Sequence, residues 1–155
     1  MSADRGFVSE TPIRVRYAET DAMGVVHHSA YVVWFEVGRS DWLRQRGPSY
    51  AELEAAGHFL PVTELWARFV APAHYDKLVT VRTWVDELRS RQIRFAYEVS
   101  DLSGRTLVVG RTTHLCTTRD GRVVAIPASL RELARPPRSS KRRGAGSSGE
   151  RHVME

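Results

Sequence analysis

The chain has 155 residues, of which 42% are hydrophobic, and this size allows one domain with a sizeable core but not two. It carries a net charge of +5 and one cysteine, Cys116, which excludes an internal disulfide and a C-x-x-C redox site and is typical of a reducing cytoplasm. The opening residues MSADRGFVSE lack the basic and apolar regions of a signal peptide, and the longest apolar run, 30–35, is too short to cross a bilayer. We therefore expect a cytoplasmic protein without membrane insertion.

Much of the positive charge lies at the C-terminus. Residues 136–155 contain five Lys or Arg and two Glu, so they contribute +3 of the net charge. The segment is rich in Pro, Gly, Ser and Arg, and burial of its few apolar residues cannot offset the entropy of ordering it. We predict a single domain at 1–135 followed by a disordered basic tail. Its KRR run could bind nucleic acid, but a solvated tail is the simpler interpretation, so nucleic acid is not an expected partner.

The first predicted elements are a strand and a long helix. Apolar residues alternate with arginines over 13–17, which predicts a strand with Ile13, Val15 and Tyr17 on one buried face. After a turn at 21–24, apolar residues recur at helical spacing: Tyr31, Trp34, Phe35, Gly38, Trp42 and Leu43. Few charges interrupt this helix, so we expect burial around most of its girth. The run RQRGP should end it, and a short second helix is predicted at 48–56.

The remainder of the body alternates with the period of strands. The predicted strands are 61–72, 77–88, 91–101, 106–118 and a short 122–126, with a helical turn or two at 127–134. Consecutive strands with short loops predict an antiparallel meander, whose inner face the long helix can cover. We predict an α+β fold, a curved antiparallel sheet of five to six strands wrapped around one central helix. Its uncovered edges and outer face predict a homodimer.

A carboxylate, a glycine turn and two histidines stand directly before the apolar helix. The N-terminus of a helix presents free N–H groups and the positive end of its dipole, which suit a carbonyl oxygen that becomes negative. Asp21, upstream of the Gly24 turn, could face the carbon atom of the carbonyl group whose oxygen lies at the helix N-terminus. Alone, Asp21 would be interpreted as a turn or cap residue, but with its neighbours the pattern favours a hydrolytic site.

The stretch RVRYAETDAMGVVHHSAYVVWFEVGRSDWLRQRG, at 14–47, resembles the hotdog-fold acyl-CoA thioesterases of the 4-hydroxybenzoyl-CoA thioesterase family, most closely their YbgC-like branch. The resemblance rests on a D-x-x-G-V-V-x-H-x-x-Y pattern at a strand-to-helix junction and on VTELWARFVAPAHYDKLVTVRT further along. It covers about 14–133. It implies the hotdog fold, hydrolysis of coenzyme A thioesters at dimer interfaces, assembly into tetramers in many members, and no metal or organic cofactor.

The resemblance also assigns roles to single residues. It makes Asp21 the catalytic carboxylate, Gly24 the turn glycine, His28 the residue whose backbone N–H polarises the thioester carbonyl, and Tyr31 the aromatic one turn later. Glu19 receives no catalytic role. Asp21 would act either as a nucleophile that forms an acyl-enzyme or as a general base on water, and the sequence leaves both open.

Further residues are candidates for binding substrate. They are His27, Tyr31, Trp66, Lys77, Arg89 and Arg91. Basic side chains suit the phosphates of coenzyme A, although basic loop residues are often simply solvated. Trp34, Trp66 and Trp84 are more often core residues, but Trp66 could line an acyl tunnel at a dimer interface.

Other kinds of site fit the sequence less well. His27 and His28 would need a third metal ligand, such as Asp21 or His114, and adjacent helix residues point in different directions, so no metal is expected. His114 is interpreted as structural and Cys116 as an inert core or interface thiol. No G-x-S-x-G elbow is present, which disfavours a Ser-His-Asp triad.

Two alternative functions stay open. The same site could release a fatty or polyketide chain from an acyl carrier protein, whose acidic helix would also suit a basic rim. The fold could instead bind acyl groups without cleaving them. Hotdog dehydratases are a weaker rival because they carry a different motif.

Overall fold

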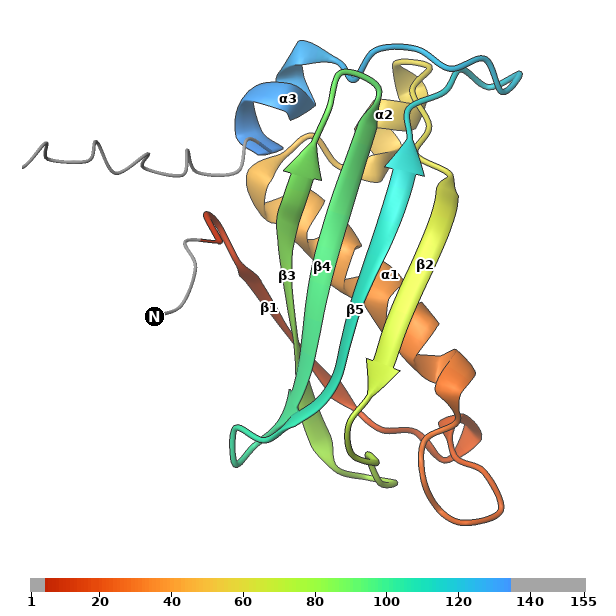
Figure 1. The fold of residues 1–155 in the computed structure, drawn as a ribbon, viewed down its shortest axis with the longest axis vertical. Helices are drawn as coiled ribbons and strands as arrows, with labels where there is room; N and C mark the ends of the chain where they lie inside the picture. The colour runs from red at the N-terminus through yellow and green to blue at the C-terminus, as the bar shows by residue number, and fades with distance from the viewer. Residues whose placement is uncertain (1–4, 135–155) are drawn as a thin grey trace, which may run out of the picture.

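The structure, a computed structural model, describes residues 5–134, so the predicted disordered tail at 136–155 lies outside the described residues. Five antiparallel strands form one sheet, and the long helix α1 (His28–Arg46) packs across one face of it (Figure 1). The strands are β1 (Ser9–Arg14), β2 (Val62–Phe69), β3 (Leu78–Leu88), β4 (Gln92–Asp101) and β5 (Thr106–Leu115). The predicted α+β architecture of one sheet wrapped around one helix is confirmed.

The strand order is β1-β3-β4-β5-β2, which differs from a continuous meander. Strands β3, β4 and β5 are neighbours as predicted, but β2 pairs with β5 at the far edge and not with β3. The N–H groups of Val70 and Ala71 donate to the carbonyl of Leu107 at 2.8 and 3.0 Å, and the Val15 N–H donates to the Lys77 carbonyl at 2.9 Å. These bonds carry the chain after β2 across the lower end of the sheet (Figure 1), so β1 and β2 form the edges.

Helix α1 buries a single stripe against the sheet. The predicted positions Tyr31, Trp34, Phe35, Gly38, Trp42 and Leu43 are all buried. A Cβ at Gly38 would collide with side chains of β3, and a Cβ at Gly110 on β5 would collide with the Phe35 ring, so two glycines let helix and sheet approach closely. The opposite side of α1 is exposed and carries Val32, Val33 and Val37. The expectation of burial around most of the girth is therefore wrong for the single chain.

Two short helices close the upper end of the sheet (Figure 1). α1 ends at Arg46 with Gly47 as its C-cap, whose φ of +57° suits only glycine well, and α2 (Tyr50–Ala55) follows. The Ser49 hydroxyl caps α2 by accepting a hydrogen bond from the Glu52 N–H at 3.2 Å. The last helix, α3 (Ala128–Ala134), matches the predicted helical turn at 127–134. Among the described residues, no helix has the length and hydropathy needed to cross a membrane.

Two predicted strand segments differ from the structure. The strand predicted at 13–17 lies earlier, at Ser9–Arg14, and the chain then turns into a short 3₁₀ helix, η1 (Tyr17–Glu19), which leaves the Tyr17 side chain exposed rather than buried. Residues 122–126 form no strand, because their N–H groups bond to separate segments: Val124 to the carbonyl of Cys116, and Ile126 to that of Ser90. A single bridge between Thr117 and Val123 is what remains of the predicted pairing.

The tryptophans divide between the core and the outer face of the sheet. Trp34, on α1, lies in the core. Trp84 lies on the outer face with the Arg5 guanidinium 4.0 Å above its ring, and Trp66 lies there beside Arg111 at 5.0 Å. Trp84 is half-buried and Trp66 is 47% exposed, so neither is a core residue of the single chain.

Candidate active site

The loop before α1 is organised by the Asp21 side chain. Its Oδ1 accepts hydrogen bonds from the Met23 N–H at 2.8 Å and the Val25 N–H at 3.4 Å. The Asp21 N–H donates to the Val25 carbonyl at 2.9 Å, and the Gly24 N–H donates to the Asp21 carbonyl at 3.0 Å. Gly24 has φ +76°, which an L side chain would adopt only with strain. These bonds hold the exposed carboxylate beside the start of the helix.

Helix α1 begins at His28, and His27 is its N-cap. The Ser29 N–H donates to Nδ1 of His27 at 3.2 Å, and the Ala30 N–H donates to the His27 carbonyl at 3.0 Å. Within residues 5–134, no group accepts the His28 N–H. With respect to the described residues, the His28 N–H is therefore an unpaired donor at the positive end of the helix.

One cavity of about 390 Å³ lies between this loop, the helix tip and the end of β2. It is lined by Asp21, Val26, His28, Tyr31 and the run Phe69 to Pro72. The Tyr31 hydroxyl accepts a hydrogen bond from the Ala73 N–H at 3.3 Å, and its ring lies 5.6 Å from that of Phe69. Burial raises the pKa of Tyr31, so it remains a neutral phenol. The cavity is therefore lined by a carboxylate and a helix N-terminus together with an apolar wall.

Glu19 holds the loop before α1 in place through hydrogen bonds to both of its ends. Its carboxylate accepts hydrogen bonds from the Trp34 indole at 2.6 Å and from the Arg16 N–H at 2.8 Å, and its carbonyl accepts from the His27 N–H at 2.8 Å. Burial alone would raise the pKa of Glu19, but the hydrogen bonds from Arg16 and Trp34 and the Arg16 guanidinium outweigh burial and lower it. Glu19 is thus an ionised structural group that joins η1 to α1.

Two predicted binding residues lie near this site without lining its cavity. His27 lines a separate cavity of about 480 Å³ on the other side of the helix tip, together with Arg16 and Glu19. Lys77 is exposed and lines a third cavity, of about 380 Å³, which shares only Pro72 with the wall that Asp21 lines.

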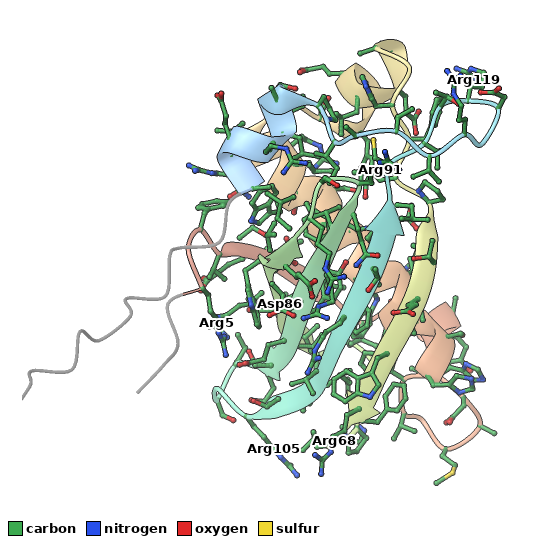
Figure 2. All side chains as sticks on the ribbon, turned by 45° about the horizontal axis from the view of Figure 1, so that its top comes forward. Arg5, Arg68, Asp86, Arg91, Arg105 and Arg119 are labelled. Atoms are coloured by element: carbon green, nitrogen blue, oxygen red, sulfur yellow. The ribbon has the colours of Figure 1, made fainter. Side chains whose placement is uncertain are left out.

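The other predicted binding residues lie far from Asp21 in this chain. Arg89 and Arg91 stand at the turn between β3 and β4, where the Arg131 guanidinium of α3 donates to the Arg89 carbonyl at 3.1 Å. This is the upper end of the sheet (Figure 2), about 30 Å along β4 from its lower end. The Arg89 guanidinium is also paired with Glu87. Trp66 pairs with Arg111 on the outer face, away from α1.

His114 and Cys116 are both buried and lie outside the cavity. His114 Nδ1 bonds to the Leu60 carbonyl and Nε2 to the Thr112 hydroxyl, both at 2.8 Å. Burial raises the pKa of the Cys116 thiol, as expected for an inert thiol. No cluster of three metal-ligating side chains occurs in the described part of the chain.

Sequence reasoning missed two kinds of residue at this site. Phe69 and Val70 line the cavity from the far-edge strand, and their only signal was an apolar run at the end of a predicted strand. The anchoring bond between Glu19 and Trp34 has no signal in the sequence, because it joins residues of two different elements.

Comparison with known proteins identifies the family of this chain. Residues 15–133 match the model of the thioesterase-like superfamily. Acyl-CoA thioesterase YbgC of Haemophilus influenzae is 33% identical over 111 residues, which cover 71% of this chain and 78% of YbgC. The crystal structure of TT1821, a hypothetical protein from Thermus thermophilus, superposes with a TM-score of 0.78 at 46% identity, covering 81% of this chain and 96% of TT1821.

A second solved structure is that of DHNA-CoA thioesterase from Staphylococcus aureus. It is 36% identical with a TM-score of 0.73, and the match covers 81% of this chain and 82% of the enzyme. The family model spans nearly all of the described residues, including the loop of Asp21 and the whole sheet after β1. The chain therefore belongs to the thioesterase-like superfamily and has the hotdog fold.

Proposed function

We propose that this chain hydrolyses acyl-CoA thioesters to a free acid and coenzyme A. The observation that carries the proposal is the shared cavity of Asp21 and His28, the latter with an N–H that no described group accepts. Membership of the thioesterase-like superfamily and the acyl-CoA thioesterase activity in the name of YbgC support the same reaction. A thioester is already activated, so a positioned carboxylate and one oxyanion donor supply most of what its hydrolysis needs.

In the proposed reaction, the thioester carbonyl oxygen accepts the His28 N–H, and Gly24 leaves room for the approach. Asp21 then either removes a proton from the water that attacks the carbonyl carbon, or attacks that carbon itself and forms an anhydride that water hydrolyses. In both routes the C–S bond breaks, the sulfur leaves as a thiolate and takes up a proton, and water supplies the new oxygen. Detection of an acyl group on Asp21 by mass spectrometry would identify the nucleophilic route.

The acyl group is proposed to lie against the apolar wall formed by Tyr31, Phe69 and Val70. The Tyr31 hydroxyl accepts from Ala73, which leaves its own proton for a polar group of the substrate. Exposed Lys77 is proposed to meet a phosphate of coenzyme A.

We further propose that the active form is a homodimer joined along β2 and that such dimers can pair into tetramers. Two copies related by a two-fold axis would pair their β2 strands antiparallel, so the upper end of one sheet would lie beside the lower end of the other. Such pairing would bring Arg89 and Arg91 of the second copy toward the substrate bound at Asp21, and Trp66 would lie at the interface. The single buried cysteine agrees with a cytoplasmic location.

Replacing Asp21 by Asn tests the function. The Asn side-chain oxygen can still accept the N–H groups of Met23 and Val25, so we expect the loop and the fold to survive. Loss of the charge should reduce thiol release from acyl-CoA by about 100-fold or more. Asp101 offers a matched control, because its Oδ1 accepts the Ser103 and Arg105 N–H groups in the β4–β5 turn in the same way.

The Asp101→Asn variant should keep the wild-type kcat, and since Asp101 lines the cavity that Lys77 also lines, any effect on acyl-CoA hydrolysis should be confined to KM. Wild-type activity in Asp21→Asn would refute the assignment of Asp21. A panel of acyl-CoA and acyl-carrier-protein substrates separates the two substrate classes, and binding of acyl-CoA without release of free thiol would favour a non-catalytic acyl-binding module.

A further inference from the structure

The N-cap of α1 is a histidine, and its side chain and carbonyl together occupy two of the three donors at the helix tip. The Ser29 N–H bonds to His27 Nδ1 at 3.2 Å and the Ala30 N–H bonds to the His27 carbonyl at 3.0 Å. The Ser29 hydroxyl also lies 2.8 Å from Nδ1. Among residues 5–134, the His28 N–H alone of these three lacks an acceptor.

The cap decides which donor is available to a ligand. Without the cap the Ser29 N–H would also lose its acceptor and the first turn would fray, because the first N–H groups of a helix have no partner within it. Since Nδ1 accepts the Ser29 N–H, the neutral His27 ring carries its proton on Nε2. The rings of His27 and His28 lie 4.2 Å apart with an angle of 31°, which restrains both.

We infer that His27 is a positioning residue for the proposed thioester hydrolysis: by capping α1 it leaves the His28 N–H as the donor at the helix tip and fixes its direction. The inference rests on the proposed function of Asp21 and His28. It replaces a binding role for His27, whose ring lines a cavity separate from the one that Asp21 lines. Misdirection of a catalytic donor by a small distance costs up to about 100-fold in rate.

Two substitutions separate the cap from the ring. His27→Phe keeps an aromatic ring beside His28 but has no acceptor, and His27→Asn restores one of the strongest N-cap side chains without a ring. We expect His27→Phe to lower kcat for acyl-CoA hydrolysis by about 10- to 100-fold with little change in KM. His27→Asn should retain kcat close to the wild type.

The N-cap of α2 provides a matched control. Ser49 accepts the Glu52 N–H at 3.2 Å, and Ser49→Ala removes a cap far from the Asp21 cavity. We expect Ser49→Ala to lower the melting temperature about as much as His27→Phe, while kcat stays at the wild-type value. Equal kcat losses in His27→Phe and His27→Asn, or a wild-type kcat in His27→Phe, would overturn the inference.

Amide hydrogen exchange measured by NMR tests whether His27 caps the helix, and it needs no substrate. The Ser29 amide should exchange about fivefold faster or more in His27→Phe than in the wild type, and should stay protected in His27→Asn. An unchanged Ser29 exchange rate in His27→Phe overturns the capping role whether or not the enzyme is active. If the wild type hydrolyses no thioester, the proposed function fails, and the exchange rates still decide whether His27 is the cap.

Discussion

The Asp21 carboxylate serves both the loop and the proposed chemistry. Oδ1 accepts two backbone N–H groups, which fixes the orientation of the side chain without a salt bridge. Among the described residues, no hydrogen bond uses Oδ2. One oxygen can therefore hold the turn while the other meets water or the thioester.

Position 28 allows the backbone donor to be removed without removing the helix. His28 is the first helical residue. Proline is favoured at this position because an N–H there would have no partner within the helix. His27 has φ −65° and ψ 140°, the extended conformation that a following proline requires. We expect His28→Pro to fold and to lower kcat for acyl-CoA hydrolysis by about 100-fold or more, measured by thiol release.

The side chain at the same position has a separate control. His28→Ala removes the imidazole but keeps the N–H, so its loss of kcat should be much smaller than that of His28→Pro. Circular dichroism and thermal melting establish that both variants keep α1. A His28→Pro variant that folds and turns over like the wild type would exclude the helix tip as the oxyanion donor.

At the scale of elements, the sequence predicted local structure better than it predicted which strands pair. The buried stripe of α1 and its C-cap at Gly47 followed from spacing and capping, and the motif placed Asp21 and His28 at one cavity. The partner of β2 could not be predicted, since it depends on bonds from Val70 and Ala71 across the sheet end to Leu107. For the same reason the wall of the cavity formed by Phe69 and Val70 was missed.

Strands β4 and β5 share a buried polar chain beneath α1. His114 bonds to Thr112, whose hydroxyl lies 2.5 Å from that of Tyr97. Burial, opposed by the bond to the Leu60 carbonyl and assisted by Arg39, lowers the pKa of His114 to about 4 from its usual 6.5. His114 is therefore neutral in the folded protein at neutral pH.

This shift predicts how stability depends on pH. Between pH 6.5 and about 4 the unfolded chain binds a proton at His114 that the folded chain does not, so the free energy of unfolding falls as the pH falls. We expect a loss of about 2 kcal/mol between pH 7.5 and pH 5, measured by urea unfolding. The lowered pKa of Glu19 keeps that carboxylate ionised in this window. The His114→Gln variant should show a flatter profile, and equal profiles would contradict the assignment.

For the whole molecule, the most exposed element of the sheet is also the one next to the cavity. Strand β2 is exposed along nearly its whole length and has an unpaired edge. Its apolar side chains include Leu65 and Phe69, at 44% and 53% exposure, and Val32 on the neighbouring helix is also exposed. A second copy paired along β2 would cover these groups and the mouth of the Asp21 cavity.

The dimer can be tested at Leu65 because this side chain is exposed in the single chain. Leu65→Lys places a charge on the edge strand, which disfavours pairing with another strand but costs the isolated subunit little. We expect sedimentation equilibrium to show a dimer for the wild type and a monomer for Leu65→Lys, with a parallel loss of kcat because the cavity mouth is left open. Val123→Lys changes a valine of similar exposure, 41%, that lies outside β2 and is bridged to Thr117, and this variant should remain an active dimer. A wild-type chain that is monomeric and fully active would show that one subunit holds the complete site.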